Sequence, residues 1–246
     1  MRLAKLIAIS GFASRREAEN IIISGRIRVN GIIINNIVTL LKCDDVVFID
    51  NIDISQWLKP GYRYSQTQLW IFYKPKGYIT SHKDPQGRPT IFSILPRNMQ
   101  NILTIGRLDL NTEGLLLLTN NGELARYFEL PKNDIERVYR CRLFGPTMRH
   151  NDLNELRNGI TIDGMRYKNI EIVQDNDKWF TVTLREGKNR EIRRIFEYLD
   201  MQVTRLIRIQ YGEFKLDNIY LGDVVEVSRP KVLKYVNNLS EEYLYE

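Results

Sequence analysis

The sequence predicts a protein of mixed helices and strands in two parts, a small N-terminal module and a larger domain. Two short helical patterns followed by a hairpin signal occupy the first part of the chain. Further on, the run Leu115 to Leu118 is too short for a typical helix and indicates a strand buried on both faces. A chain of 246 residues is long enough for one or two domains with a sizeable core.

The composition is that of an ordinary globular protein, with 43% hydrophobic and 27% charged residues. The formal charge of +6 favours an anionic partner, and residues 1–31 hold six basic residues against two acidic ones. No run approaches the roughly 20 apolar residues that cross a bilayer, and no signal-peptide core is evident. We therefore expect a cytoplasmic protein without a membrane partner.

The sequence contains few residues that could bind a metal or take part in redox chemistry. Cys43 and Cys141 lie far apart without neighbouring ligands, which predicts reduced packing residues rather than a disulfide or a metal site. The only histidines, His82 and His150, give little material for a zinc site or a Ser/His/Asp triad. The sequence predicts no metal and no cofactor.

Two helices are predicted at the N-terminus. Apolar residues recur at helical spacing over residues 3–7, until Gly11 interrupts the pattern. A second helix begins at Ser14, because Ser14 and Glu17 have the spacing of a capping box, and it ends at Gly25. Asn30-Gly31 then predicts a hairpin, since both central residues of a type I′ turn need a positive φ.

The stretch RLAKLIAISGFASRREAENIIISGRIRVNG, which ends at Gly31, resembles the S4 RNA-binding domain. That resemblance implies that Arg15, Arg16 and Arg26 face RNA. From the residues alone, a solvated basic face is an equally good interpretation of the two arginines at the helix start. The predicted domains are an S4 domain with its linker over residues 1–60, a catalytic domain over 61–234, and a frayed acidic tail over 235–246.

The linker is expected within residues 51–68, which are polar and aromatic around Pro60-Gly61. Beyond it, apolar runs and alternation predict four main strands, and helical spacing predicts three helices. The strands are expected at residues 69–73, 115–118, 136–144 and 181–184; the helices at 123–128, 152–158 and 192–199; and a pair of short strands within 159–168.

Asp109 is the leading candidate for catalysis. It lies in a Gly/Asn/Thr-rich turn before the leucine strand, where a carboxylate can be fixed at the floor of a cleft. An ordinary turn-forming Asp is the alternative. The stretch GRLDLNTEGLLLLTNNGELA, Gly106 to Ala125, resembles the GRLDxxTxGLLLLTNDGxLA signature of the RsuA/RluB-type pseudouridine synthases, with Asn121 where Asp is usual. This resemblance implies that Asp109 is the essential catalytic residue.

Two later segments resemble the same family. Tyr139, in ERVYRCRLF, matches the tyrosine that packs against the target base, and EGKNREIRR matches the motif whose arginine, here Arg193, pairs with the catalytic Asp. From residues alone, a strand tyrosine is ordinarily a core residue. The resemblance further implies a pocket wall at Ile192 and RNA contacts for basic residues in the loops, namely Arg107, Arg190, Lys74, Lys76 and Arg88.

The resemblance, which spans residues 1 to about 233, also implies the fold and the reaction. The fold is α+β: a small, mobile S4 domain joined to a mixed, mostly antiparallel sheet with flanking helices, bisected by the active cleft. The reaction is the isomerisation of uridine to pseudouridine in ribosomal RNA, which needs no cofactor. The IERVYRCRLFG segment favours 23S rRNA. The alternatives are 16S rRNA, or a non-catalytic RNA-binding assembly factor. The expected partner is ribosomal RNA or an assembly intermediate, and the expected state is a monomer.

Overall fold

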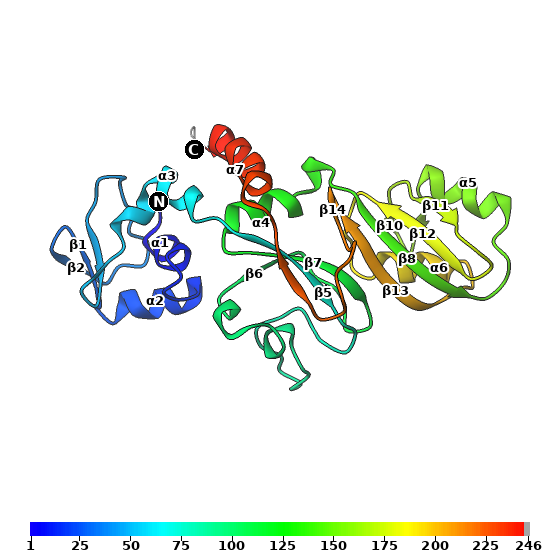
Figure 1. The fold of residues 1–246 in the computed structure, drawn as a ribbon, viewed down its shortest axis with the longest axis horizontal. Coiled ribbons are helices and arrows are strands. Elements are labelled where there is room, and N and C mark those ends of the chain that lie inside the picture. The colour runs from blue at the N-terminus through cyan, green and yellow to red at the C-terminus, as the bar shows by residue number, and fades with distance from the viewer. Residues whose placement is uncertain (244–246) are drawn as a thin grey trace.

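The computed structural model describes residues 1–243. Figure 1 shows an elongated molecule with the N-terminal module at one end and a large sheet filling the rest. The sheet has nine strands, and strands and helices alternate irregularly along the chain. The predicted α+β class is confirmed.

The N-terminal module follows the predicted order. Its helices pack on a four-stranded sheet, and both halves of the capping box form: Glu17 N donates to Ser14 Oγ over 3.3 Å, and Ser14 N donates to Glu17 Oε2 over 3.0 Å. Asn30 and Gly31 have the positive φ that the hairpin requires. The elements are α1 (Leu3–Ile9), α2 (Arg15–Ile23), β1 (Ile27–Val29), β2 (Ile32–Ile34), β3 (Val47–Ile49) and β4 (Ile52–Asp53).

The segment expected to be a linker is instead largely ordered. After β4 it forms a 3-10 helix, Ser55–Leu58, and then α3 (Pro60–Ser65). Leu58 is buried in the core of the N-terminal module, whereas Tyr64 is buried in a core of the large domain. Each domain therefore holds one end of this connection by an apolar side chain, which the polar composition of the segment did not reveal.

The nine strands of the large sheet are mostly antiparallel, as predicted. The path is β11-β12-β8-β13-β7-β5-β15, with β6 paired to β7 and β14 paired to β13. Among the paired strands of the described residues, only β13 and β7 run in parallel. The strands are β5 (Leu69–Lys74), β6 (Leu103–Ile105), β7 (Glu113–Thr119), β8 (Arg137–Phe144), β11 (Glu171–Gln174), β12 (Trp179–Leu184), β13 (Gln202–Tyr211), β14 (Phe214–Lys215) and β15 (Val224–Glu226).

The leucine run forms the centre of β7 and is buried on both faces, which confirms the prediction. Leu115 and Leu117 contribute to one apolar core, while Leu116 and Leu118 contribute to another on the opposite face. Helix α4 (Gly122–Glu129) covers the first of these cores. Every leucine of the run is therefore fully buried, and the strand has no solvent-facing side.

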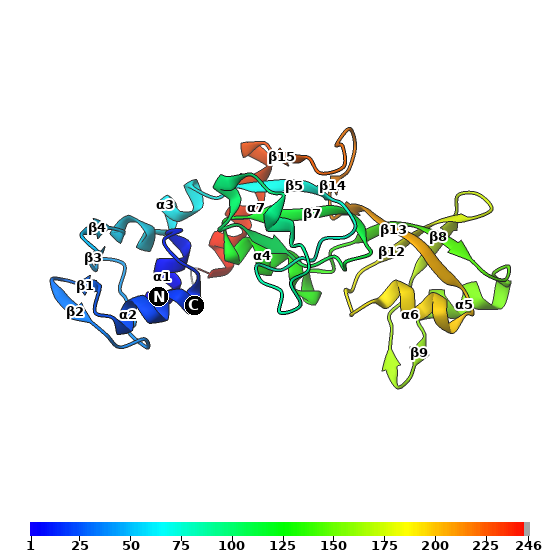
Figure 2. The same cartoon turned by 90° about the horizontal axis from the view of Figure 1, so that it is seen from below.

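The other half of the sheet has its own core. Figure 2 shows α5 (His150–Asn158) and α6 (Glu191–Tyr198) on the same side of β8, β12 and β13. The apolar stripe of α6, including Ile192, Ile195 and Phe196, is buried against that side. The predicted hairpin forms as β9 (Thr161–Ile162) and β10 (Met165–Arg166).

The two halves of the sheet meet at the parallel pairing of β7 with β13, which we call the seam. Its register has only two residue pairs, Ile207 with Glu113 and Arg208 with Gly114. Gly114 has φ +119°, and a Cβ added there would lie 2.3 Å from the carbonyl oxygen of Arg208. Glycine is thus required at this position for the two strands to approach.

Two predictions about other parts of the chain need correction. The last helix, α7 (Arg229–Tyr243), runs through the tail expected from residue 235, because Val236 and Leu239 are buried against the same core as α4. Residues 244–246 of that tail lie outside the described residues. Cys141 is a buried packing residue, and burial raises the pKa of its thiol to about 12, but Cys43 is exposed. Within residues 1–243, no helix is both long and apolar enough to cross a bilayer.

Candidate active site

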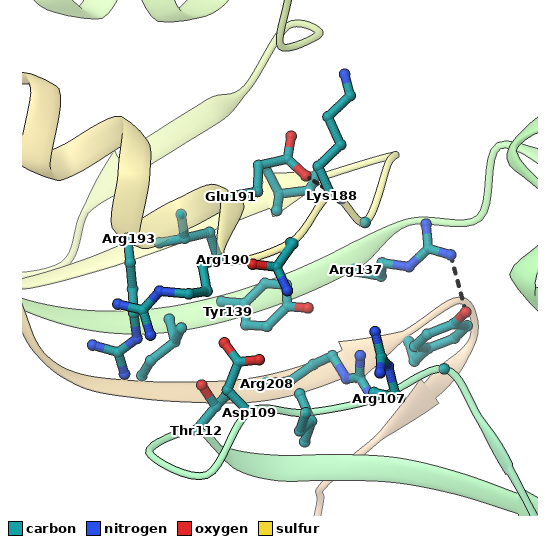
Figure 3. A pocket seen from close by; sticks show the side chains of 18 of the residues that line it. Arg107, Asp109, Thr112, Arg137, Tyr139, Lys188, Arg190, Glu191, Arg193 and Arg208 are labelled. Atoms are coloured by element: carbon teal, nitrogen blue, oxygen red, sulfur yellow. Dashed lines mark hydrogen bonds between the residues drawn. The ribbon is translucent and has the colours of Figure 1, made fainter. Parts of the chain in front are cut away.

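A cavity of about 550 Å³ opens at the seam and joins both halves of the sheet. Its lining comes from the loop before β7, from β8 and β13, and from the loop that leads into α6 (Figure 3). Segments far apart in the sequence thus build one site. Six of the residues predicted for catalysis or substrate binding line it: Arg107, Asp109, Tyr139, Arg190, Ile192 and Arg193.

The backbone around Asp109 is held from several sides. Thr112 N donates to Asp109 O over 3.0 Å, which closes the predicted turn. Gly77 N donates to Leu110 O over 2.7 Å, and Thr80 Oγ1 donates to Leu108 O over 2.9 Å. A loop fixed in this way presents its carboxylate in one orientation. Figure 3 shows that carboxylate directed toward the ring of Tyr139.

Lys74 supports this loop from beneath and is not a phosphate contact, contrary to the prediction. Its side chain is fully buried, and Nζ donates to the carbonyl oxygens of Pro75, Asp109 and Thr112 over 3.0, 3.2 and 2.9 Å. Burial lowers the pKa of Lys74 to about 8, although the carboxylates of Asp109 and Glu113 act in the opposite direction. All three donors of the ammonium group are used within the protein.

Arg193 reaches the loop without forming the predicted ion pair with Asp109. Nη1 donates to Val203 O over 2.8 Å and Nη2 to Asn111 O over 2.9 Å. Within the described chain, no N–O contact of 4.0 Å or less joins Arg193 to Asp109. Burial and the neighbouring Arg190 lower the pKa of Arg193, while the charge of Asp109 raises it. The guanidinium therefore links α6 and β13 to the loop of Asp109.

Tyr139 forms the opposite wall from Asp109. It lies on β8 between Val182 of β12 and Arg208 of β13, and its half-buried ring packs against cores on both sides of the seam. One face of the ring is left to the cavity, so it can accept a planar ligand by stacking.

Arg208, on β13, is a cavity residue that the sequence did not single out. Its side chain is 2% exposed and lines the cavity. Nε donates to Leu115 O over 2.7 Å, whereas Nη2 is buried and has no hydrogen-bond partner. The alternation of side chains along β13 indicates this burial, because Leu206 and Arg208 face the same side of the sheet and Leu206 is a core residue.

Arg137, on β8, is the second arginine whose burial was not foreseen. Its Nη2 donates to Tyr211 Oη over 3.0 Å, as drawn in Figure 3. The guanidinium also lies over the Tyr211 ring, 4.9 Å from its centroid. Figure 3 shows Arg190 and Arg193 on one side of Asp109, and Arg107 and Arg208 on the other. Arginine side chains therefore surround the carboxylate of Asp109 in this cavity.

The wall of the cavity also contains a buried carboxyl group with a raised pKa. Glu191, at the start of α6, is buried and accepts from Lys188 N over 3.0 Å. Burial, and next the neighbouring carboxylate of Glu186, raise the pKa of Glu191 to about 8. Burial beside Glu186 thus disfavours the ionised form of Glu191.

The remaining predicted RNA contacts lie outside this cavity. Arg15, Arg16 and Lys76 are exposed. Arg26 forms an ion pair with Asp50, and Arg88 forms one with Asp84 over 2.7 Å, so both of these guanidinium groups already have anionic partners. The structure thus offers Arg15, Arg16 and Lys76 to a polyanion more readily than Arg26 or Arg88.

Comparison with known proteins gives a consistent result. The family model described as RNA pseudouridylate synthase matches residues 68–198, and the S4 domain model matches residues 1–47. An uncharacterized RNA pseudouridine synthase of Rickettsia felis is 46% identical over 95% of this chain and 99% of its own. The ribosomal large subunit pseudouridine synthase B of Buchnera aphidicola subsp. Acyrthosiphon pisum is 39% identical over 97% and 96%.

A solved structure shares the architecture. The crystal structure of a pseudouridylate synthase superposes with a TM-score of 0.67 at 25% sequence identity, over 96% of this chain and 99% of that one. The likeness covers both the N-terminal module and the large sheet. The family match, the relatives and the shared architecture agree that this chain is an enzyme of the RNA pseudouridylate synthase family with an N-terminal S4 domain.

Proposed function

We propose that the enzyme converts one uridine of ribosomal RNA into pseudouridine, and that the RNA is 23S rRNA. The observation that carries this proposal is the fixed carboxylate of Asp109, set among arginines and directed toward the ring of Tyr139. The 23S assignment is supported by the relatives named ribosomal large subunit pseudouridine synthase B and by the IERVYRCRLFG segment.

In the proposed reaction, Asp109 acts at the ribose of the target nucleotide. The bond between uracil N1 and the sugar C1′ breaks, the uracil turns within the cavity, and C5 bonds to C1′. The proton that leaves C5 is balanced by the one that N1 gains. Asp109 serves either as nucleophile at C1′ or as base at the 2′ position, and it is regenerated at the end.

The surrounding residues have supporting roles in this proposal. Tyr139 stacks on the uracil, which keeps the free base in place between bond cleavage and rejoining, and its hydroxyl takes part in moving the C5 proton. Arg193 holds the loop of Asp109 through its hydrogen bond to Asn111 O. Ile192 walls the pocket, and Arg107 and Arg190 neutralise the phosphates of the flipped nucleotide.

We assign RNA binding to the S4 domain and chemistry to the sheet domain, divided near residue 60. The exposed Arg15 and Arg16 at the start of α2 support this division. Under this proposal the enzyme works as a cytoplasmic monomer on ribosomal RNA or on an assembly intermediate.

The test is Asp109→Asn, because the amide keeps the shape of the side chain and removes its charge. We expect no pseudouridine formation by the purified variant under single-turnover conditions, with unchanged melting temperature and RNA affinity. The control is Asp163→Asn, an exposed turn residue with positive φ that Asn tolerates. Turnover by Asp109→Asn above a few per cent of the parent rate would refute the assignment.

Mapping pseudouridines in rRNA from cells with and without the gene tests the substrate. We expect one 23S position to lose its modification, and the gene encoding Asp109→Asn to leave it unmodified. A lost position in 16S rRNA would replace the 23S assignment. If no position changed while ribosome assembly failed, the protein would be a non-catalytic assembly factor.

A further inference from the structure

A second cavity, of about 860 Å³, lies between the S4 domain and the sheet domain. Its walls come from α1 and the start of α2 on one side, and from α3, α4 and the loop after α4 on the other. We call it the basic cleft, because five of its lining side chains are cationic: Lys5, Arg15, Arg63, Arg126 and Lys132.

Among the described residues that line the basic cleft, Glu123 is the one acidic residue. It accepts from Lys5 Nζ over 2.8 Å and from Tyr64 Oη over 3.1 Å, and Arg63 Nη2 lies 3.6 Å away. Although burial raises the pKa of Glu123, Lys5 and Arg63 bring it below its ordinary value. Glu123 is therefore ionised, and within the described residues its ion pairs are with Lys5 and Arg63, not with Arg15 or Arg126.

Two of the cations are available to a ligand. Arg15 and Arg126 are exposed, and within the described chain neither forms an ion pair. Arg63 is mostly buried, and its Nε has no hydrogen-bond partner. An anion that entered the cleft would thus meet two free guanidinium groups and one incompletely bonded one.

Asn121 contributes to this charge balance. It stands where the signature of the family usually has Asp, and it caps α4 by accepting from Glu123 N over 2.8 Å. Its amide nitrogen donates to Thr67 Oγ1 over 2.8 Å, a bond that a carboxylate could not donate. A carboxylate at this cap would add a second negative charge beside Glu123 among the described lining residues, and the neutral Asn121 adds none.

The basic cleft shares a wall with the catalytic cavity. Along the segment that follows α4, Glu129 and Pro131 line the catalytic cavity, whereas Leu130 and Lys132 line the basic cleft. A chain that left the active site over this segment would enter the basic cleft directly. The ligand is therefore expected to be a long polyanion that occupies both hollows.

We propose that the basic cleft binds the sugar–phosphate backbone of the rRNA strand next to the target uridine, with Arg15 and Arg126 as phosphate contacts. Lys5 and Arg63 divide their charge between Glu123 and the entering phosphates. The S4 domain and the sheet domain thus grip one strand together. This inference rests on the proposed function, since it assigns a route to the RNA whose uridine is modified.

The test is Arg126→Glu, with Arg157→Glu as the matched control. Arg157 is exposed on α5, which lies at the far end of the molecule in Figure 1. Binding of an rRNA fragment that contains the target is measured as a function of salt concentration. We expect Arg126→Glu to weaken binding at least tenfold and to reduce the log–log salt slope by roughly 0.7 to 0.9 for each lost phosphate contact. The control should match the parent.

A second measurement places the RNA. A photoreactive amino acid at Gln66, an exposed residue that lines the basic cleft, should crosslink to nucleotides beside the target uridine, and the same group at the exposed Lys178 should not. Unchanged affinity and salt slope for Arg126→Glu, or crosslinks only to remote nucleotides, would overturn the proposal. These binding measurements do not depend on catalysis. An active Asp109→Asn enzyme would therefore refute the catalytic assignment without affecting the test of the basic cleft.

Discussion

The ammonium group of Lys74 donates to the carbonyl oxygen of Asp109 over 3.2 Å, and to that of Thr112 over 2.9 Å. It therefore bonds both ends of the turn that carries the candidate catalytic carboxylate. Because Lys74 ends β5, which pairs along the length of β7, the position of the turn is fixed relative to the sheet. A cation that lies beneath the backbone orients Asp109 without contacting the substrate.

Replacing Lys74 with Met should lower the single-turnover rate by about 10- to 100-fold, because a carboxylate displaced by about 1 Å loses that much. RNA affinity should change little, since the lysine is buried. The measurement is the rate at saturating enzyme together with the dissociation constant. Lys178→Met, an exposed change at a lysine that lines neither cavity, should keep the parent rate. A normal rate in Lys74→Met would show that the loop is held by its other bonds alone.

Arg208→Lys should reduce kcat/KM at least tenfold, which corresponds to about 1.4 kcal/mol. Lysine keeps the positive charge but has a single nitrogen. Arginine can bond Leu115 O through Nε and still offer Nη2 to a ligand, which lysine cannot do. The control is Arg205→Lys on the same strand, because Arg205 pairs with Glu113 instead of lining the cavity. Equal activity of the two variants would argue against a role for Arg208 in substrate binding.

Glu191 should make the protein less stable as the pH rises. Its pKa is raised to about 8, so the folded state binds a proton that the unfolded state releases near pH 4.5. The stabilisation is complete below pH 4.5 and is lost between pH 4.5 and 8, with a slope of up to about 1.4 kcal/mol per pH unit. The pKa of Glu186 is lowered, so Glu186 titrates below this window.

Glu191→Gln should therefore flatten the fall in unfolding free energy between pH 5 and pH 8, as measured by urea denaturation at several pH values. Glu197→Gln, an exposed change on the same helix, should leave the slope as it is. A slope that was the same in Glu191→Gln and the parent would mean that Glu191 is ionised throughout this range.

Tyr139→Phe and Tyr139→Leu should differ. Phe keeps the stacking surface and should bind the substrate normally, whereas Leu should lose about 1 to 3 kcal/mol of stacking. If Phe binds normally but stalls after the glycosidic bond is cut, the hydroxyl moves the late proton. Near-parent activity of both variants under single-turnover conditions would show that Tyr139 is only a packing residue of β8.

Local signals predicted the elements well, and long-range contacts explain the misses. The capping box of α2, the Asn30-Gly31 turn and the leucine strand each depend on neighbouring residues, so the sequence contains their whole cause. The role of Lys74 depends on carbonyl groups 35 and 38 residues further along the chain, which no local pattern encodes. Likewise, α7 forms where an acidic tail was predicted, because Leu239 packs into a core built by distant segments.

The sequence predicted the site residues that belong to a recognisable motif. It did not predict the contacts of those residues, because these depend on the packing of distant segments. Asp109, Tyr139 and Arg193 were foreseen and do share one cavity. The bonding of Arg193 to Asn111 O rather than to Asp109, and the burial of Arg208, depend on how β13 and α6 pack. The ion pairs of Arg26 with Asp50 and of Arg88 with Asp84 were likewise not predicted from the sequence, because they depend on the backbone conformation.

The seam between β7 and β13 has a kinetic consequence. Asp109 belongs to the half of the sheet that contains β7, and Tyr139 and Arg193 belong to the half that contains β13. The bond from Arg208 to Leu115 that spans the two halves joins residues 93 apart in the sequence. Contacts of such high contact order form slowly, because the chain entropy of closing the loop is lost before they add stability. Catalytic competence therefore requires that the two halves have docked, and activity during refolding reports that docking.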